Sequence, residues 1–207
     1  MLQFKHKAGI VGILIAAVVV VIVFIDLSNA PEAAAQTEYK LGGKEATITL
    51  NGTSTLHDWV MTAHTFACDA QFNATNNGKL AGITSLSLTL PVANLKSESD
   101  GLNDNAYKAL KSDIYKNIIF VMTTSKITSS LEEVYKITVW GNLTIAGVMK
   151  PVGFYLQVNN NADGSISCTG SLPLKMSTYD IERPSFLLGA MKAGDALTLK
   201  FDLGLVK

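Results

Sequence analysis

Hydrophobic and polar residues alternate with a period of two along most of this chain. The clearest run lies near the C-terminus, where the apolar positions are Leu197, Leu199, Phe201, Leu203 and Leu205. The same alternation recurs at 86–90, 135–139 and 152–158. Because successive side chains of a strand point to opposite faces, the pattern predicts strands with one buried face and one solvated face.

Shorter apolar stretches predict further strands. They lie at 47–50, 56–61, 66–72, 118–124, 143–146 and 165–174. The stretches are separated by turn signals, of which Asn76-Asn77-Gly78 and Ala162-Asp163-Gly164 are typical of hairpins. Ala146-Gly147 and the segment Lys192–Asp195 are further turn candidates. About eight strands in meander order predict an all-β, antiparallel, up-and-down barrel.

One segment departs from the β pattern. Asn103, Asp104 and Asn105 precede a short run with helical spacing that ends at Lys111. Asn and Asp side chains accept hydrogen bonds from the first N–H groups of a helix, so the segment predicts a short helix capped by one of them. We expect this helix over the barrel wall or one mouth, and a loop at 93–102.

The N-terminal residues are typical of an export signal. A basic segment at 5–7 precedes an apolar run from Ala8 to Ile25, and Ala33-Ala34-Ala35 follows. This order predicts a secretory signal peptide cleaved after Ala35. The apolar run is also long enough for an uncleaved membrane anchor. We therefore divide the chain into a signal peptide or anchor at 1–35 and one domain at 36–207. The domain is predicted to be periplasmic or secreted, or held at the inner membrane through residues 8–25.

Charge and motifs exclude several functions. The chain has 17 Lys and Arg against 17 Asp and Glu, whereas nucleic-acid binding requires a basic face. No nucleophile elbow, zinc-protease motif or phosphate loop occurs. His57 and Asp58 are neighbours on a predicted strand, so their side chains point to opposite faces. With Trp59 they are expected at a barrel mouth, and His64 is expected in a solvated turn. We expect no enzyme, cofactor or metal site.

The two cysteines, Cys68 and Cys168, share the phase of the apolar positions around them. Both thiols should therefore face the interior. They can form a disulfide if their strands are neighbours or face each other closely. Otherwise they are small buried hydrophobic residues. The spacing leaves both alternatives open.

The predicted interior is almost purely aliphatic and aromatic. The candidate ligand-binding residues, taken from strand phase, are Phe66, Phe72, Leu86, Leu88, Phe120, Met122, Ile137, Phe154, Leu156, Leu199 and Phe201. A small barrel either fills its interior with side chains or encloses one ligand. An apolar cavity would favour an aliphatic ligand, because an unpaired polar group inside costs several kcal/mol. Periodicity alone does not decide between the two.

Several segments, in chain order, resemble the YceI-like family of polyisoprenoid-binding, lipocalin-like proteins. They are Thr53–Trp59, Asn105–Lys111 with Ile118–Phe120, Gly141–Val152, and Tyr179–Pro184 with Leu188–Asp195. The resemblance covers nearly all of 36–207. One departure is Met149, where family members often carry Thr.

The resemblance implies an eight-stranded extended lipocalin-like barrel whose apolar pore holds an isoprenoid chain, such as a quinone tail. It also implies a periplasmic or secreted protein without catalytic residues. We therefore expect non-enzymatic binding, storage or transport of an amphiphilic lipid. The alternative is a structural or stress-related envelope module with a filled barrel. A homodimer is left open.

Overall fold

The computed structural model describes residues 36–42, 45–74, 79–131, 133–186 and 191–207. The chain divides into two compact units, Met1–Ala33 and Ala34–Lys207, and every described residue belongs to the second. The predicted signal peptide or anchor and the Asn76-Asn77-Gly78 turn lie outside the described residues. No helix within the described ranges is long and apolar enough to span a membrane.

The unit is built mainly from strands. They are β1 (Gln36–Leu41), β2 (Thr47–Ser54), β3 (Trp59–Ala63), β4 (Ala67–Ala74), β5 (Leu80–Pro91), β6 (Asn117–Leu131), β7 (Val134–Ile145), β8 (Val148–Asn160), β9 (Ile166–Lys175), β10 (Ser185–Phe186) and β11 (Met191–Val206). The helices among the described residues are η2 (Val92–Asn94), α1 (Asp100–Ala109) and η3 (Met176–Tyr179), and they lie in the connections.

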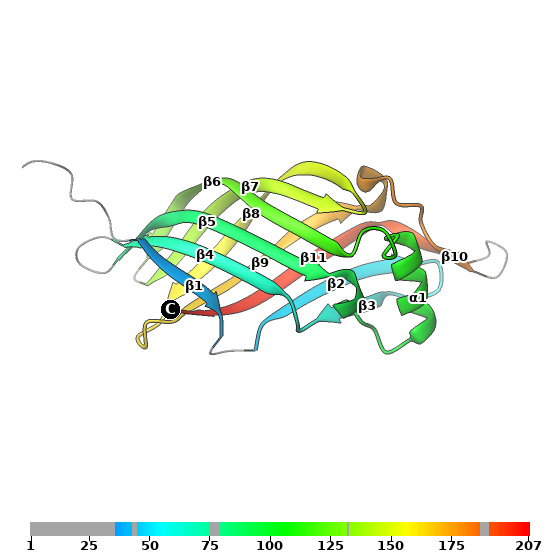
Figure 1. Cartoon of the computed structure of the whole chain (residues 1–207), viewed down its shortest axis with the longest axis horizontal. Helices are drawn as coiled ribbons and strands as arrows, with labels where there is room; N and C mark the ends of the chain where they lie inside the picture. Colours follow the sequence, from blue (N-terminus) through cyan, green and yellow to red (C-terminus); the bar gives the residue numbers. More distant parts are fainter. Residues whose placement is uncertain (1–35, 43–44, 75–78, 132, 187–190) are drawn as a thin grey trace, which may run out of the picture. The chain divides into compact units, whose positions relative to one another are not determined.

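Eight antiparallel strands close into a ring (Figure 1). Their order is β1-β4-β5-β6-β7-β8-β9-β11, and β11 returns to pair with β1 through Leu205 and Leu41. The earlier part of β11 pairs with β2, which in turn pairs with β3. At that end Thr62 and Lys96 exchange two main-chain hydrogen bonds, of 2.6 and 2.9 Å. The predicted all-β antiparallel fold with one short α-helix is confirmed.

One end of the ring is packed with side chains, and we call it the packed end. Tyr39, Tyr135 and Val158 are buried there, as is Leu80 at the start of β5. The main-chain N–H of Leu80 donates a hydrogen bond of 3.1 Å to the hydroxyl of Tyr135. Tyr39 and Phe72 meet edge to face with ring centroids 5.3 Å apart. The Leu80–Tyr135 hydrogen bond and the Tyr39–Phe72 contact help to pack this end of the ring.

Two predicted turns are confirmed by their backbone angles. Ala146 and Gly147 have φ angles of 49° and 82°, as the tight hairpin turn between β7 and β8 requires. Gly164 has a φ of 81° in the connection between β8 and β9. The predicted turn at Lys192–Asp195 is wrong, because this segment belongs to β11 and forms an irregularity in its pairing with β2.

The helix prediction was right in kind and wrong at its start. Helix α1 begins at Asp100, inside the predicted loop, and its N-cap is Ser99, whose side chain accepts a hydrogen bond from the N–H of Leu102. Asn103 is buried instead, and its side-chain oxygen accepts a hydrogen bond of 2.7 Å from the N–H of Ser97. This internal bond ties the incoming loop to the helix.

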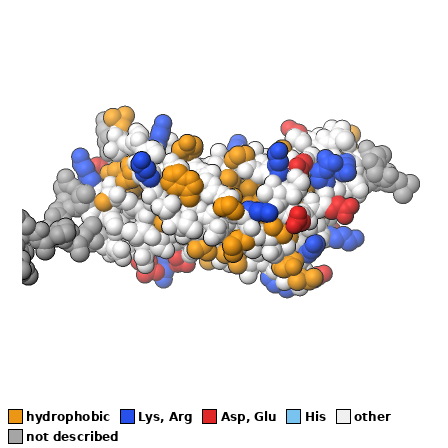
Figure 2. Space-filling model, turned by 90° about the horizontal axis from the view of Figure 1, so that it is seen from above, with side chains coloured by type: hydrophobic (Ala, Val, Ile, Leu, Met, Phe, Trp, Pro, Cys, Tyr) orange, Lys and Arg blue, Asp and Glu red, His pale blue; other side chains and the backbone are white. Residues whose placement is uncertain are grey.

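The face of the surface seen in Figure 2 mixes both signs of charge with hydrophobic side chains. The large exposed apolar residues of the described chain include Leu56, Ile114, Trp140, Met149 and Tyr155. They come from several elements of the fold.

Candidate functional site

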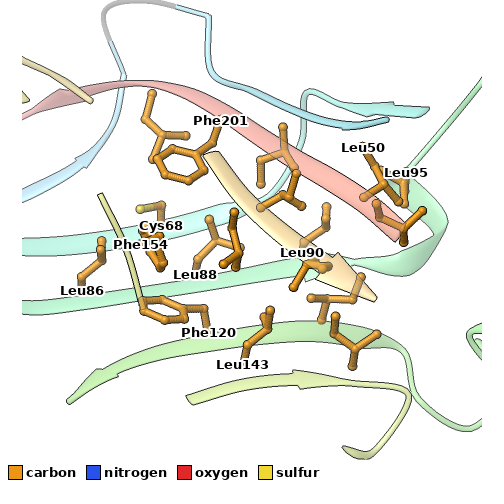
Figure 3. Close-up of a pocket in the computed structure, with 18 of the residues that line it drawn as sticks. Leu50, Cys68, Leu86, Leu88, Leu90, Leu95, Phe120, Leu143, Phe154 and Phe201 are labelled. Atoms are coloured by element: carbon orange, nitrogen blue, oxygen red, sulfur yellow. The ribbon is translucent and has the colours of Figure 1, made fainter. Parts of the chain in front are cut away.

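An apolar cavity, which we call the tunnel, runs inside the ring of strands (Figure 3). The volume of this cavity is about 130 Å³, so it is narrow. Apart from Lys175 and Tyr179, every lining side chain is Ile, Leu, Phe, Met or Cys. Strand β11 lines it from Leu197 to Leu205, and those eight steps span about 26 Å along the strand.

Eight of the eleven predicted ligand-binding residues lie on the tunnel wall. They are Phe72, Leu86, Leu88, Phe120, Phe154, Leu156, Leu199 and Phe201. The other three do not line it: Ile137 is fully buried in the core, and Phe66 and Met122 pack against the core from partly buried positions. Contact of any of them with a ligand stays a prediction.

Sequence reasoning missed part of the wall. Leu203 and Leu205 share the phase of Leu199 and Phe201, so the alternation of β11 already carried their signal. The connections contribute further wall residues, of which the helical phase marked only Leu110. These are Leu95, Leu110, Met176, Tyr179 and Ile181.

Three phenylalanines meet in the tunnel. The ring centroid of Phe154 lies 5.3 Å from that of Phe120 and 5.6 Å from that of Phe201, both in edge-to-face geometry. A Cβ atom at Gly141 would lie 2.5 Å from the Phe120 ring, and one at Gly170 would lie 2.3 Å from the Phe201 ring. We call these two positions the glycine recesses. They let two of the three rings lie against the strands instead of crossing the tunnel.

The two cysteines line the tunnel and are free thiols in this structure, so the disulfide left open by the sequence is not formed in it. Burial, with a smaller contribution from Asp69, raises the pKa of Cys68 to about 12. Burial, followed by the effects of Cys68 and Asp202, raises the pKa of Cys168 to about 12. Both thiols are therefore protonated at neutral pH and serve as apolar wall.

A second hollow of about 520 Å³ lies beside helix α1, and we call it the vestibule. Six residues line both the tunnel and the vestibule, so the two hollows adjoin at these residues, which we call the neck. The neck residues are Leu50, Leu95, Leu110, Met176, Ile181 and Leu197. Beyond them the vestibule adds Ser54, His57, Ser99 and Lys192, and no acidic residue is among the described residues that line it.

Helix α1 holds one side of the neck. Tyr107 on this helix donates its hydroxyl hydrogen toward two main-chain carbonyls, Ala93 O at 3.1 Å and Leu95 O at 2.9 Å. This contact fixes the helix to the segment that carries Leu95. Leu110, at the C-terminal cap of α1, then reaches the neck.

Helix η3 holds the other side of the neck. The carboxylate of Asp195 on β11 accepts hydrogen bonds from the hydroxyl of Ser177 at 2.7 Å and from its N–H at 2.8 Å. These bonds, chiefly the one from the side chain, hold the pKa of Asp195 below its usual value. Asp180 then adopts a left-handed conformation with a φ of 53°, which ends η3 and turns the chain toward Ile181. Met176 and Tyr179 are thereby placed over the cavity.

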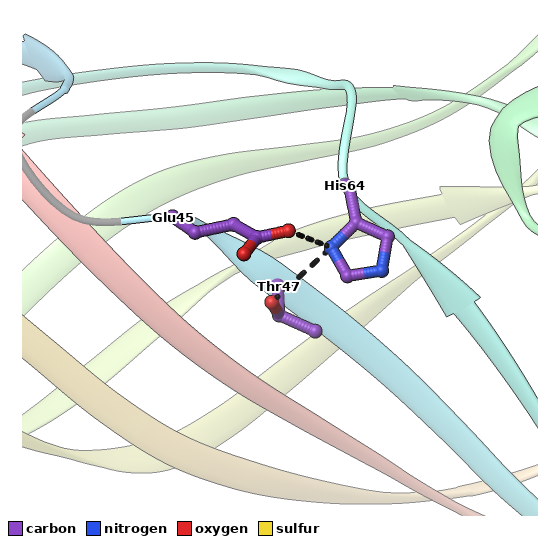
Figure 4. A network of polar contacts seen from close by, with 3 residues as sticks. All are labelled: Glu45, Thr47 and His64. Atoms are coloured by element: carbon purple, nitrogen blue, oxygen red, sulfur yellow. Dashed lines mark hydrogen bonds and ion pairs between the residues drawn. The ribbon is translucent and has the colours of Figure 1, made fainter.

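The histidines lie outside the tunnel. His64 follows β3 on the surface, where its Nδ1 lies 3.0 Å from Glu45 Oε1 and 3.5 Å from Thr47 Oγ1 (Figure 4). His57 is exposed, with Nδ1 2.8 Å from its neighbour's carbonyl oxygen, Asp58 O. The structure describes no cluster of three or more potential metal ligands within its ranges.

Trp59 lines the vestibule together with His57. The predicted strand at 56–61 begins only at Trp59, so the placement of His57 and Asp58 on a strand is wrong. The indole N–H of Trp59 donates a hydrogen bond of 2.9 Å to Thr53 O. A Cβ at Gly52 would lie 2.1 Å from the indole ring, so this glycine makes room for it. The arrangement therefore offers apolar contact in the tunnel and a few polar groups outside the neck.

Comparison with known proteins points to one family. The family model described as YceI-like domain matches residues 33–205. Burkholderia cenocepacia BcnA superposes with a TM-score of 0.63 at 19% identity, covering 77% of this chain and 95% of its own. A Saccharophagus degradans domain described as polyisoprenoid-binding and implicated in plant cell wall breakdown gives 0.61 at 13%, covering 81% and 97%.

A mutant Campylobacter jejuni YceI protein with a monobromobimane guest gives a TM-score of 0.52 at 20% identity, covering 68% of this chain and 81% of its own. Among curated proteins, none matches. At these identities the superpositions show a shared fold.

Proposed function

This chain belongs to the YceI-like family, and on that premise we propose that it binds an amphiphilic lipid without catalysing a reaction. The lipid's chain would lie in the tunnel and its head toward the vestibule. The ligand class we propose is an isoprenoid or isoprenoid quinone. The description of the Saccharophagus degradans relative as a polyisoprenoid-binding domain supports this class.

The observation that carries the proposal is an apolar tunnel with different ends. Near the packed end the lining is Phe72, Ile83 and Leu205, while the neck at the opposite end adjoins the vestibule, which Ser54 and Lys192 line. Each CH₂ group moved from water into such a lining gains about 0.8 kcal/mol. A polar head would lose its hydrogen bonds in the tunnel, at a cost of several kcal/mol. An amphiphile with its head outside satisfies both conditions.

We further propose that the protein is exported and carries or stores the lipid. The basic, apolar and small-residue pattern of 1–35 supports export to the periplasm or beyond, with residues 8–25 as signal or anchor. A lipid carrier or store in an aqueous compartment needs an enclosed apolar site, which the tunnel supplies. A filled barrel, the alternative, predicts side chains across the whole interior. The apolar cavity inside the ring of strands favours the lipid-binding interpretation.

The experiment has two parts. Purified protein from its native host is extracted with organic solvent and examined by native mass spectrometry for bound lipid. Lipid-free protein is then titrated with a prenyl quinone. In parallel, Leu199→Trp places a large ring in the tunnel, and Lys200→Trp places the same ring on the exposed outer face of the same strand.

We expect copurified lipid, quinone binding by the unaltered protein, and loss of binding only in Leu199→Trp. Circular dichroism and urea unfolding establish that both variants are folded. If neither lipid extraction nor titration reveals binding, or if both Trp variants bind like the unaltered protein, the tunnel is not a lipid site.

A further inference from the structure

Tyr179 places a polar group at the apolar neck. It is the last residue of η3, is 2% exposed and lines the tunnel. Met176 and Ile181, which flank it in sequence, are both neck residues. Tyr179 lines only the tunnel, so it lies just inside the neck.

The hydroxyl of Tyr179 is buried and has no hydrogen-bond partner in the part of the chain that the structure describes. Most buried polar groups in proteins have a hydrogen-bond partner, so a buried hydroxyl without one needs a specific explanation. Tyr135 offers a contrast within the same ring of strands: its buried hydroxyl accepts the N–H of Leu80 at 3.1 Å. Burial also raises the pKa of Tyr179, which keeps its hydroxyl a neutral donor at physiological pH.

We propose that Tyr179 donates a hydrogen bond to an uncharged oxygen of the bound lipid, such as a quinone carbonyl, at the neck. This inference rests on the proposed lipid binding. It orients the ligand with its oxygen-bearing end toward the vestibule and its chain toward the packed end. It also makes Tyr179 a specificity residue that separates oxygenated prenyl lipids from prenyl hydrocarbons.

An uncharged acceptor fits the surroundings better than an anionic one. Lys175 is the one charged residue among the described residues of the tunnel wall, and it is exposed. It acts on Asp195 at the outer surface, where it helps to lower the pKa of that carboxyl. Because the other neighbours of Tyr179 on the wall are apolar, an anion there would have no paired positive charge.

The neck can admit a head group because its side chains are adaptable. The Tyr179 hydroxyl has almost no accessible surface in this structure, so apolar side chains must shift to let a ligand reach it. Met176, an unbranched thioether with several rotatable bonds, suits such a movement. The oxygen of the lipid would then take the place of the apolar side chains that contact the Tyr179 hydroxyl.

The test compares two probes on the purified full chain. One is a prenyl quinone, and the other is squalene, a prenyl hydrocarbon without oxygen. Dissociation constants are measured for the unaltered protein, for Tyr179→Phe, and for Tyr135→Phe as a matched control outside the tunnel. We expect Tyr179→Phe to weaken quinone binding by roughly two- to tenfold, the range of one hydrogen bond. Squalene binding should stay unchanged, and Tyr135→Phe should leave the ratio of the two affinities unchanged.

Infrared spectroscopy gives a direct readout that does not require the variant to fold. A quinone carbonyl that accepts a hydrogen bond absorbs at lower frequency than a free one. In the unaltered protein we expect one bound carbonyl shifted downward, and in Tyr179→Phe we expect the shift to disappear. If that variant does not fold, an unshifted carbonyl band in the unaltered protein overturns the inference, and a shifted band supports it.

Other results separate this inference from the proposed function. If the unaltered protein binds neither probe, the proposed function and the inference both fail. If it binds quinone, but Tyr179→Phe leaves the affinity unchanged or weakens both probes equally, the inference fails and lipid binding stands. In the latter case Tyr179 acts through packing alone.

Discussion

The glycine recess at Gly170 offers a sharp test of how the tunnel is kept open. In Gly170→Ala the added methyl group would lie 2.3 Å from the Phe201 ring and 2.7 Å from the carbonyl oxygen of Tyr155. The ring can swing into the tunnel, but the oxygen belongs to the main chain of β8 and cannot leave without disturbing the β8–β9 pairing. We therefore expect both a loss of stability and a narrower tunnel.

The magnitude follows from the cost of overpacking. Forcing one methyl group into a packed site destabilises a protein by about 1–3 kcal/mol. In a domain of this size each kcal/mol lowers Tm by roughly 2–4 °C, so the expected fall in Tm is roughly 2–12 °C. The displaced ring should also weaken binding of a chain-like lipid relative to the unaltered protein.

Gly82 on β5 supplies the matched control, because nothing lies within 4 Å of a Cβ built on it. Gly82→Ala restricts the unfolded chain without a clash, so it should stabilise the protein by about 0.4–1 kcal/mol. The assay is urea unfolding followed by circular dichroism, with thermal melts and lipid titrations on the same samples. Equal stability and equal lipid affinity of the two alanine variants would refute the role assigned to the recess.

Three further predictions concern single groups. Because burial raises the pKa of Cys68 and of Cys168 to about 12, we expect neither thiol to react with a thiol reagent at pH 8 until urea unfolds the protein; rapid reaction in the native state would contradict this. Tyr135→Phe leaves the buried N–H of Leu80 unpaired, so it should cost about 1–3 kcal/mol of unfolding free energy, measured by urea titration, and an unchanged midpoint would show that the bond is dispensable. The hydrogen bonds from Ser177 lower the pKa of Asp195 in the folded state, so the stability that this carboxylate contributes is complete above about pH 4 and is lost as the pH falls through the folded-state pKa. In Asp195→Asn the urea midpoint should therefore fall less between about pH 5 and about pH 2 than in the unaltered protein. Parallel pH profiles of the two proteins would exclude the contribution.

The sequence predicted the strands well where one face is apolar and the other polar. The alternation of 197–205 placed Leu199 and Phe201 on the tunnel wall, and the same rule placed Leu86 and Leu88 there. Strand β1 was missed because Gln36–Leu41 is mostly polar, with Tyr39 as its one buried side chain. Its pairing with β4 and β11 supplies what the local pattern lacks.

The alternation of apolar and polar residues could not predict whether the ring is hollow, nor where the glycine recesses lie. Period-two alternation is the same for a hollow ring and a filled one, because the difference depends on how side chains from opposite strands meet. The recesses at Gly141 and Gly170 depend on cross-strand contacts with Phe120 and Phe201, which no single strand reveals.

The wall residues on η3 and just after it escaped prediction for another reason. Met176, Tyr179 and Ile181 lie in a connection, where side-chain direction follows no period. Gly194-Asp195 carries turn chemistry, yet β11 continues through it, and there the Asp195 carboxylate accepts two hydrogen bonds from Ser177. Tertiary contacts overrode a local signal there.

The long strand β11 also has a consequence for how the protein reaches its native state. It joins the ring to segments far away in sequence, as in the bond between Asn51 and Thr198, which are 147 residues apart. Closing so large a loop carries a high entropic cost, and domains dominated by such distant pairings fold slowly. Until β11 pairs with β9 and β1, the ring is open and the apolar inner face of strands β4 to β9 is exposed to water. We therefore expect the protein to refold slowly.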